Sequence, residues 1–189
     1  TPPHAIEAEQ SVLGGLLIDN SSWDHVAETL TEADFFRHAH QLIWRTMFQL
    51  AQKSISFDLV TLADVLKSHN LLEETGGIAY LASLESSTPS AANIRVYAQI
   101  VREKALLRKL ITAGTEAVNM AFLPEGRSAL DVIDTAEKLI FDVAQQGQSG
   151  KKSYASSKDL LKLCVERISD LYENPNQVTG IQTFYEDFD

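Results

Sequence analysis

Apolar residues recur every three or four positions along much of the chain, which is the spacing of amphipathic helices. We expect one helix from Ala5 to Ile18 and a longer one from about Ala39 to Lys53. Shorter helices are expected after Ser21, after Thr61 and over residues 78–84. No series of alternating positions typical of β-strands is present. The pattern therefore predicts a compact helical subdomain over residues 1–94.

Three residue pairs have the spacing of a capping box, in which the residue before a helix and the third residue inside it exchange hydrogen bonds. The pairs are Ser21 with Asp24, Thr31 with Asp34, and Thr61 with Asp64. Each is expected to mark the start of a helical segment.

A longer amphipathic pattern runs from about Ala92 to Phe122 and has two rows of heptad spacing, which is close to that of a coiled coil. One row holds Ile100, Leu107, Gly114 and Ala121, and the other Lys104, Ile111 and Val118. Residues 123–127 read Leu-Pro-Glu-Gly-Arg and predict a tight reversal. The returning pattern keeps Ile133, Ala136, Ile140 and Val143 on one side, capped by Ser128 and Asp131. Together these features predict an antiparallel helical hairpin over residues 95–146.

The remaining residues predict three further segments. Residues 147–156 are rich in Gly, Ser and Lys and predict a flexible linker. Residues 157–173 predict an isolated linker helix, whose apolar stripe needs a cover from another subunit or domain. Residues 174–189 look like the opening of a further folded unit.

Composition limits the function classes. The net charge of -10 and the pI of about 4.9 give a surface that repels phosphate backbones, although acidity could serve solubility alone. The single cysteine, Cys164, excludes an internal disulfide and fits a reducing compartment. No apolar run has the length of a membrane span, and the N-terminus lacks a signal-peptide pattern. A cytoplasmic location without a membrane partner is expected.

Candidate chemistry is sparse. The segment around Lys151 fails as a phosphate-binding loop, because the first glycine of that motif would fall at Gln145 and Lys152 replaces the required Ser or Thr. The five histidines lack the cysteine pair or His-Glu motif of a zinc site. We therefore expect no catalytic residue, no bound cofactor and no metal site within residues 1–189.

Basic residues gather on the first half of the expected hairpin. They could form a solvated helix face or a weak contact for a partner or phosphate, and the absence of interleaved aromatic residues favours the solvated face. The residues are Arg95, Arg102, Lys104, Arg108 and Lys109.

Three segments are more specific than these patterns. They are Ile6–Gly14 (IEAEQSVLG), Asp58–Leu62 (DLVTL) and Thr88–Ile94 (TPSAANI), the last leading to Tyr97 and to Ile100–Lys104. Their order and spacing resemble the N-terminal domain and linker helix of bacterial replicative DNA helicases of the DnaB type. Gly76–Leu81 and Thr179–Thr183 extend this resemblance, which covers essentially the whole chain and is strongest up to Lys104.

The resemblance implies an all-α collar whose hairpins pair and close into a hexameric ring. It also implies that the linker helix docks on a neighbouring subunit, and that a primase and a helicase loader are partners. The family's RecA-like ATPase domain would lie beyond Asp189. That domain would use ATP and Mg²⁺ to unwind duplex DNA while holding single-stranded DNA, so none of this chemistry is assigned to residues 1–189.

Positions within the motifs nominate three sets of contact residues, each of which could instead pack within its own chain. Primase-side candidates are Glu7, Ile78, Tyr80 and Ile111, and Tyr80 could equally be a core tyrosine. Subunit-pairing candidates are Leu107, Leu110, Val118, Ile133 and Ile140. Linker-docking candidates are Leu161, Val165, Ile168 and Tyr172. The alternatives to a helicase collar are a stand-alone dimerising adaptor and, less favoured, a small helical hydrolase.

Overall fold

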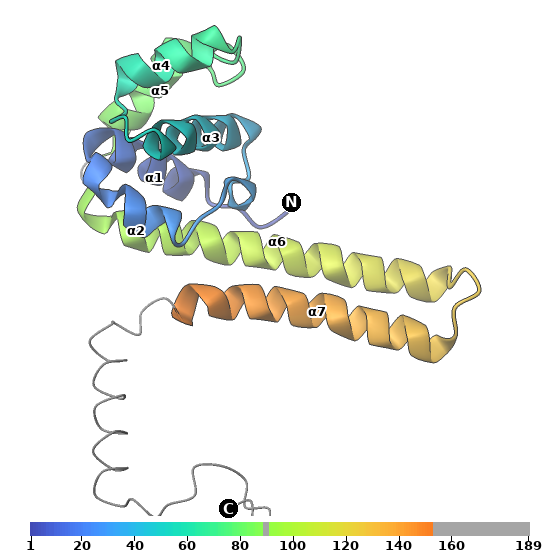
Figure 1. The fold of residues 1–189 in the computed structure, drawn as a ribbon. Helices are drawn as coiled ribbons and strands as arrows, with labels where there is room; N and C mark the ends of the chain where they lie inside the picture. The colour runs from blue at the N-terminus through green and yellow to red at the C-terminus, as the bar shows by residue number, and fades with distance from the viewer. Residues whose placement is uncertain (89–90, 153–189) are drawn as a thin grey trace, which may run out of the picture. The chain divides into compact units, whose positions relative to one another are not determined.

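The computed structural model describes residues 1–88 and 91–152, and within these residues every regular element is helical (Figure 1). The α-helices are α1 (Ile6–Ile18), α2 (Trp23–Ala27), α3 (His38–Gln52), α4 (Leu59–Ser68), α5 (Gly77–Ser87), α6 (Ile94–Phe122) and α7 (Ala129–Lys152). Short 3-10 helices are η1 (Asn20–Ser22), η2 (Glu32–Asp34) and η3 (Ala91–Asn93). The predicted all-α fold is confirmed. No helix of the described residues is long and apolar enough to cross a bilayer.

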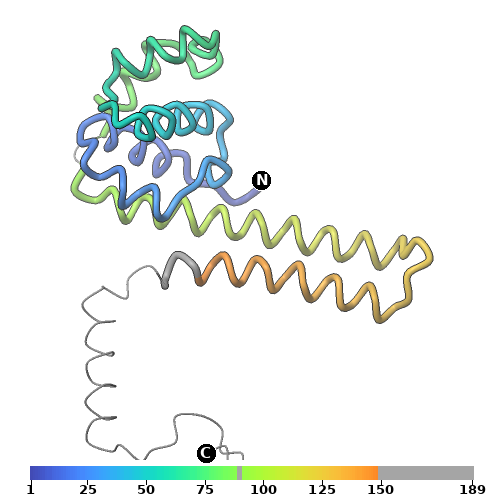
Figure 2. Tube along the Cα trace, in the orientation of Figure 1, coloured from blue at the N-terminus to red at the C-terminus, as the bar shows by residue number. Residues whose placement is uncertain are grey.

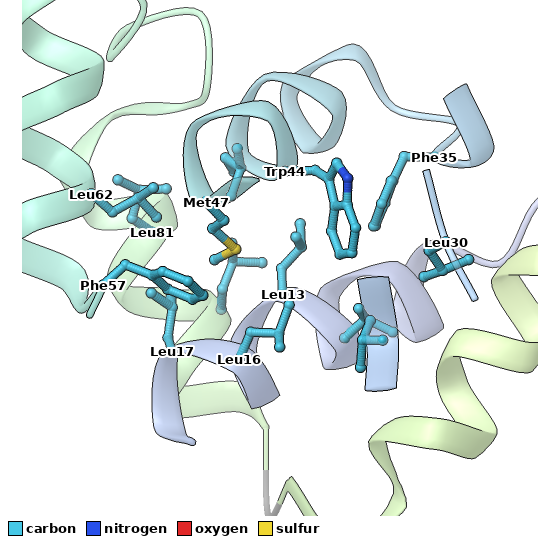
Figure 3. Packing of buried hydrophobic residues seen from close by; sticks show 14 of the residues in the cluster. Leu13, Leu16, Leu17, Leu30, Phe35, Trp44, Met47, Phe57, Leu62 and Leu81 are labelled. Atoms are coloured by element: carbon cyan, nitrogen blue, oxygen red, sulfur yellow. The ribbon is translucent and has the colours of Figure 1, made fainter. Parts of the chain in front are cut away.

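Helix α1 is the centre of the globular part, here called the head, which comprises α1 to α5 and the start of α6. Its residues from Val12 to Ile18 are all apolar or glycine, so other elements must cover most of that part of the helix. Helices α3, α5 and α6 all pack against it. Figure 3 shows Leu13 and Leu16 of α1 among Trp44 and Met47 of α3, all of which are buried. The head therefore folds as a shell around one helix.

Close packing between α1 and α5 depends on Gly14. A Cβ atom built on Gly14 would collide with the backbone carbonyl of Leu84 and with the hydroxyl of Thr88. Backbone atoms cannot swing aside as a flexible side chain can, so only glycine allows the two helices to approach this closely.

The first turns of α6 belong to the head, and the rest forms a hairpin with α7. Ile94, Ala98, Val101 and Ala105 of α6 are buried. Further along, α6 and α7 run antiparallel side by side (Figures 1 and 2). Ala113 and Met120 of α6 and Val132 of α7 are buried. The predicted hairpin is present, but its attachment to the head extends well past the predicted boundary at residue 94.

The turn between α6 and α7 follows the sequence prediction. Glu125 and Gly126 both have positive φ angles, 52° and 81°. Ser128 and Asp131 then cap α7, with the Ser128 hydroxyl 2.6 Å from Asp131 Oδ2. Hydrogen bonds from the Ser128 side chain and backbone lower the pKa of Asp131. The carboxylate is thus held in the charged form that a helix N-terminus favours.

Two of the other predicted caps are wrong, each by a few residues. Asp19, rather than Ser21, caps η1 and accepts a hydrogen bond from the Ser21 backbone N–H. Helix α4 begins after a capping box of Asp58 with Thr61, not Thr61 with Asp64. The box of Thr31 with Asp34 is confirmed in η2. Asp and Thr serve as either member of such a pair, so the spacing alone leaves the register open.

Helix α7 also differs from the prediction at its end. It continues to Lys152, so residues 147–152 are helical where the sequence predicted the start of a flexible linker. Glycine disfavours helix by only about 1 kcal/mol per residue, and the preceding helix can extend through it. The predicted linker helix of residues 157–173, with Leu161, Val165, Ile168 and Tyr172, lies outside the described residues, as do residues 174–189.

The Gly14 contact generates a stability prediction. Gly14→Ala should destabilise the protein by about 3 kcal/mol, because the new methyl group must push α1 and α5 apart. Gly147→Ala is the matched control: it lies within α7, where a Cβ would make only ordinary contacts with Leu106, and it should stabilise by about 0.5 to 1 kcal/mol. Thermal unfolding of the two variants at one concentration checks both. Equal effects would show that the α1–α5 contact is not tight.

Candidate docking surfaces

Apolar residues of the hairpin are exposed to solvent. All five predicted subunit-pairing residues are among them, with between 41% and 59% of each residue exposed. On α6 they occupy a sector roughly 100° wide, the usual width of a buried helix stripe. They are Leu107, Leu110 and Val118 on α6 and Ile133 and Ile140 on α7. Leu107 and Val118 belong to the two heptad rows, and the structure leaves both open to solvent.

Further exposed apolar residues were not predicted from the sequence, three of them at the hairpin turn and one, Phe141, in the middle of α7. Phe122, Leu123, Leu130 and Phe141 are all more than half exposed, and Phe122 reaches 80%. They fall outside the heptad rows, although their apolar character beside a polar reversal was a usable signal. Exposed apolar residues grouped in this way are typical of a surface that binds protein.

The predicted primase-side residues come from three different elements. Glu7 lies on α1 and is exposed, Ile78 and Tyr80 lie on α5, and Ile111 lies on α6. Ile78 is 56% exposed and borders a groove of about 290 Å³ between α4 and α5, whose other apolar lining includes Val60 and Leu72. Of the four candidates, Ile78 is the one that lines this groove.

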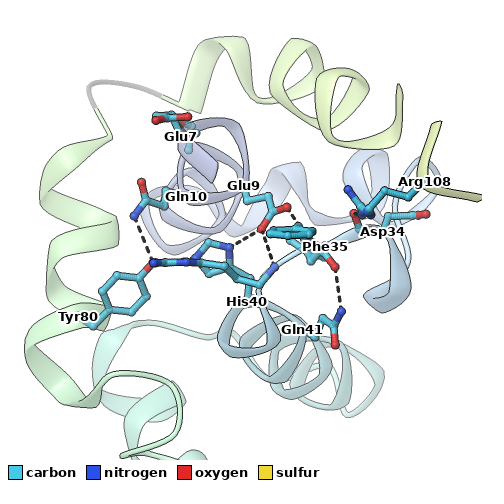
Figure 4. A network of polar contacts seen from close by, with 12 residues as sticks. Glu7, Glu9, Gln10, Asp34, Phe35, His40, Gln41, Tyr80 and Arg108 are labelled. Carbon is cyan, nitrogen blue, oxygen red and sulfur yellow. Dashed lines mark hydrogen bonds and ion pairs between the residues drawn. The ribbon is translucent and has the colours of Figure 1, made fainter. Parts of the chain in front are cut away.

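Tyr80 is half-buried and has a different environment from Ile78. Its hydroxyl lies 2.7 Å from His40 Nε2, and it accepts hydrogen bonds from Gln10 Nε2 at 3.2 Å and from an Arg37 guanidinium nitrogen at 3.4 Å (Figure 4). The figure shows this hydroxyl turned towards α1 and α3, apart from Glu7. The hydroxyl of Tyr80 thus bonds to other side chains of the head, as expected if Tyr80 is a core tyrosine and does not contact primase directly.

The network continues from His40 to a fully buried carboxylate, Glu9. His40 Nδ1 lies 2.6 Å from Glu9 Oε2, and both side chains are essentially inaccessible. Glu9 also accepts hydrogen bonds from the backbone N–H groups of Phe36 at 2.7 Å and Arg37 at 3.4 Å, immediately before α3. A side chain of α1 therefore holds the two residues that precede α3, which sequence spacing could not indicate because the partners are 27 and 28 residues apart.

A second buried carboxylate, Asp34, joins the head to the hairpin. Besides closing the capping box with Thr31, it accepts two hydrogen bonds from Arg102 Nη1 at 3.0 and 3.1 Å. Lys109 Nζ lies 3.5 Å away, and the other Arg102 nitrogen donates to the Gln146 carbonyl of α7. One carboxylate of η2 is thus linked to both arms of the hairpin.

Arg108 adds a third link. It donates to the carbonyls of Pro3 and Asp34, at 2.8 and 2.6 Å, and lies over the ring of Phe36. The favoured interpretation of the basic cluster as a solvated face is therefore wrong for Arg102, Arg108 and Lys109, whose charges stabilise the junction. Arg95 remains exposed.

An exposed ion pair beside this junction offers a contrast. Glu32 and Arg45 interact through two hydrogen bonds on the surface of η2 and α3. The hydrogen bond from Arg45 lowers the pKa of Glu32, so the pair is charged at neutral pH. Water screens such a pair, which makes its contribution to stability small.

Within the described residues no group of three or more His, Cys, Asp or Glu side chains could hold a metal ion. Every buried side-chain nitrogen and oxygen that the structure describes there has a hydrogen-bond partner. The buried acids Glu9 and Asp34 are thus engaged in holding helices together.

The fold and these surfaces define a class: an all-helical head fastened by buried carboxylates to a hairpin with an uncovered apolar face. The chain belongs to the family described as the DnaB-like helicase N terminal domain, whose model matches residues 1–103. The resemblance found in the sequence is thereby confirmed.

Curated relatives match along nearly the whole chain. The replicative DNA helicase DnaB of Haemophilus influenzae is 39% identical over 190 residues, and the replicative DNA helicase DnaC of Bacillus subtilis is 38% identical over 188 residues. The match covers 100% of this chain but 41% of either relative. The chain therefore spans about two fifths of the length of these helicases.

Two solved structures share the fold. The N-terminal domain of DnaB helicase from Mycobacterium tuberculosis has 42% identity and a TM-score of 0.72, covering 75% of this chain and 99% of that one. A DnaB-like replicative helicase, solved in a study of its interactions with primase, has 26% identity and a TM-score of 0.61, covering 74% of this chain and 31% of that one.

The two ion pairs around η2 generate a matched prediction. Asp34→Asn should cost about 3 kcal/mol of stability, because the Arg102 charge keeps its buried position and loses its partner. Glu32→Gln, two residues away, removes an exposed pair and should cost less than about 1 kcal/mol. Urea unfolding of both variants measures the difference. Similar losses would mean that Asp34 does not fasten the hairpin.

Proposed function

We propose that this chain is the assembly and docking part of a longer replicative DNA helicase. The observation that carries the proposal is the exposed apolar face of the hairpin, because a second copy of the same face covers it without leaving polar groups unpaired. In a two-fold pair the same patch serves both partners, and an apolar patch is complementary to itself. Paired hairpins would then build a ring, which for this family we infer to be a hexamer.

The charge balance bears on how such a pair is held. Two copies of a chain with a net charge of -10 repel each other at long range. Contact between apolar faces has to overcome that repulsion, and added salt screens it. Association through this face should therefore persist or strengthen as salt is raised, whereas association through surface ion pairs would weaken.

Replacing Leu107 and Val118 together by Asp should convert the assembly to monomers, because each pairing would bury four uncompensated carboxylates. Thr112→Asp with Asn119→Asp is the matched control, since it adds the same charge to exposed positions of α6 outside the apolar sector. Sedimentation velocity at several concentrations measures the mass. If the apolar-face variant sediments as the unaltered protein does, the hairpin is not the interface.

Primase is the partner we propose for the head. Support comes from the family and from the relative whose solved structure concerns its interactions with primase. Among the nominated residues, Ile78 is an exposed apolar side chain beside a groove, and such a site suits an apolar anchor from a partner. Ile111 is similarly exposed on the hairpin.

Ile78→Ser should weaken binding of the cognate primase about tenfold, the loss typical of removing one apolar anchor. Ile55→Ser is the control, because Ile55 is also a partly exposed isoleucine of the head but lies in the loop after α3. Isothermal titration with each variant gives the two affinities. Equal affinities would remove the α4–α5 groove from the primase surface.

The remaining activities belong to the longer protein. We infer that its further domain binds ATP and Mg²⁺, holds single-stranded DNA and unwinds the duplex in the cytoplasm. A loader would place the ring on DNA, and the segment with Leu161 and Tyr172 would contact a neighbouring subunit. The 41% coverage of the relatives by this chain supports such a further part.

A further inference from the structure

Tyr80 is held from two directions at the start of α5. Its hydroxyl has three polar neighbours, Gln10, Arg37 and His40, from two other helices and the residue before α3. On the other side, a Cβ built on Gly76 would lie 2.8 Å from the Cβ of Tyr80. Gly76 also has a φ of 94°, a conformation that glycine adopts without strain. The position of this ring is therefore fixed by its surroundings.

Counting hydrogen bonds gives the direction of the contact between Tyr80 and His40. A tyrosine hydroxyl has one proton to donate and two lone pairs to accept. The amide nitrogen of Gln10 and the guanidinium of Arg37 can only donate, so together they occupy both lone pairs. The single proton of Tyr80 is then left for His40, whose Nε2 must accept it.

The same count at the other end of the imidazole agrees. Glu9 already accepts from the backbone N–H groups of Phe36 and Arg37, as a carboxylate does. Its Oε2 can only accept from His40 as well, so the proton of His40 lies on Nδ1. His40 is thereby a neutral imidazole with one fixed tautomer. The hydrogen bonds run from Tyr80 to His40 to Glu9, all donated in the same direction.

We propose that this relay makes Tyr80 a positioning residue for the docking surface around Ile78. The chain of hydrogen bonds ties the first turn of α5 to α1 and to the start of α3, and Ile78 lies in that turn. Fixing the turn fixes where Ile78 stands beside the α4–α5 groove. Tyr80 acts on a partner through the position of α5 and not through its hydroxyl, which the interior uses.

The tautomer can be observed directly. In the full chain with ¹⁵N-labelled histidine, NMR should show His40 neutral, with the proton on Nδ1 and slow to exchange. Glu9→Gln should keep this tautomer, because Tyr80 still donates to Nε2 and the new amide oxygen can accept from Nδ1 as the carboxylate did. A charged His40, or a proton on Nε2 in either the unaltered protein or Glu9→Gln, would overturn the relay.

A double-mutant cycle tests the positioning role. Tyr80→Phe removes the proton given to His40, and His40→Asn retains a donor for Glu9 but cannot reach Tyr80, so each breaks the same link. Each should raise hydrogen exchange of the α5 amides roughly fivefold, the effect of one lost hydrogen bond. The double variant should show no more than the same fivefold change. Multiplying effects, near 25-fold, would show that the two residues act independently.

Binding of the cognate primase supplies the functional readout, and this part rests on the proposed function. Both single variants should bind about fivefold more weakly, although the exposed surface chemistry is unaltered, and Ile78→Ser should add little once the relay is broken. If the exchange and tautomer results hold while Ile78→Ser also leaves binding unchanged, the relay stands and the primase site lies elsewhere. If Ile78→Ser weakens binding but Tyr80→Phe does not, the positioning role is wrong.

Discussion

The apolar second half of α1 must be covered, and the arrangement of the head follows from that constraint. A helix segment that is apolar almost all round cannot lie on a surface, so α3, α5 and α6 pack around it. Because the start of α6 is part of this packing, the direction of the whole helix is set by the core. The hairpin therefore leaves the head in a defined direction, with one long face that the protein's own core never reaches.

Two buried carboxylates, Glu9 and Asp34, fix the relative positions of helices that apolar packing alone does not fix. Burial of apolar surface is non-directional, whereas hydrogen bonds to charged groups require specific geometry. Glu9 fixes the start of α3 against α1, and Asp34 fixes η2 against both arms of the hairpin. A buried charge is costly unless it is fully paired, so each carboxylate specifies its surroundings closely. The positions of α3 and of the hairpin thus depend on two buried carboxylates, Glu9 and Asp34, as well as on apolar packing.

The sequence was most informative about features that depend on nearby residues, although it placed two caps a few residues away from their positions. Helical periodicity located the helices, and the heptad rows included Leu107 and Val118, which the structure shows exposed. It could not give contacts between distant positions. The capping box of Thr31 with Asp34 was predicted correctly, but the ion pair of Asp34 with Arg102 joins residues 68 positions apart. Local spacing holds no information on such a pair, so the basic cluster looked solvated.

That pairing also changes what the net charge means. The count of 16 basic against 26 acidic residues already makes the chain acidic. Three basic residues of α6 donate their hydrogen bonds within the protein, to Asp34, to backbone carbonyls and to Gln146. They are Arg102, Arg108 and Lys109. Fewer cations are then available to meet phosphate groups than the composition suggests. An acidic head whose hairpin cations are engaged internally is suited to contacts with proteins. Under the proposed function, DNA binding would then fall to the part of the helicase outside this chain.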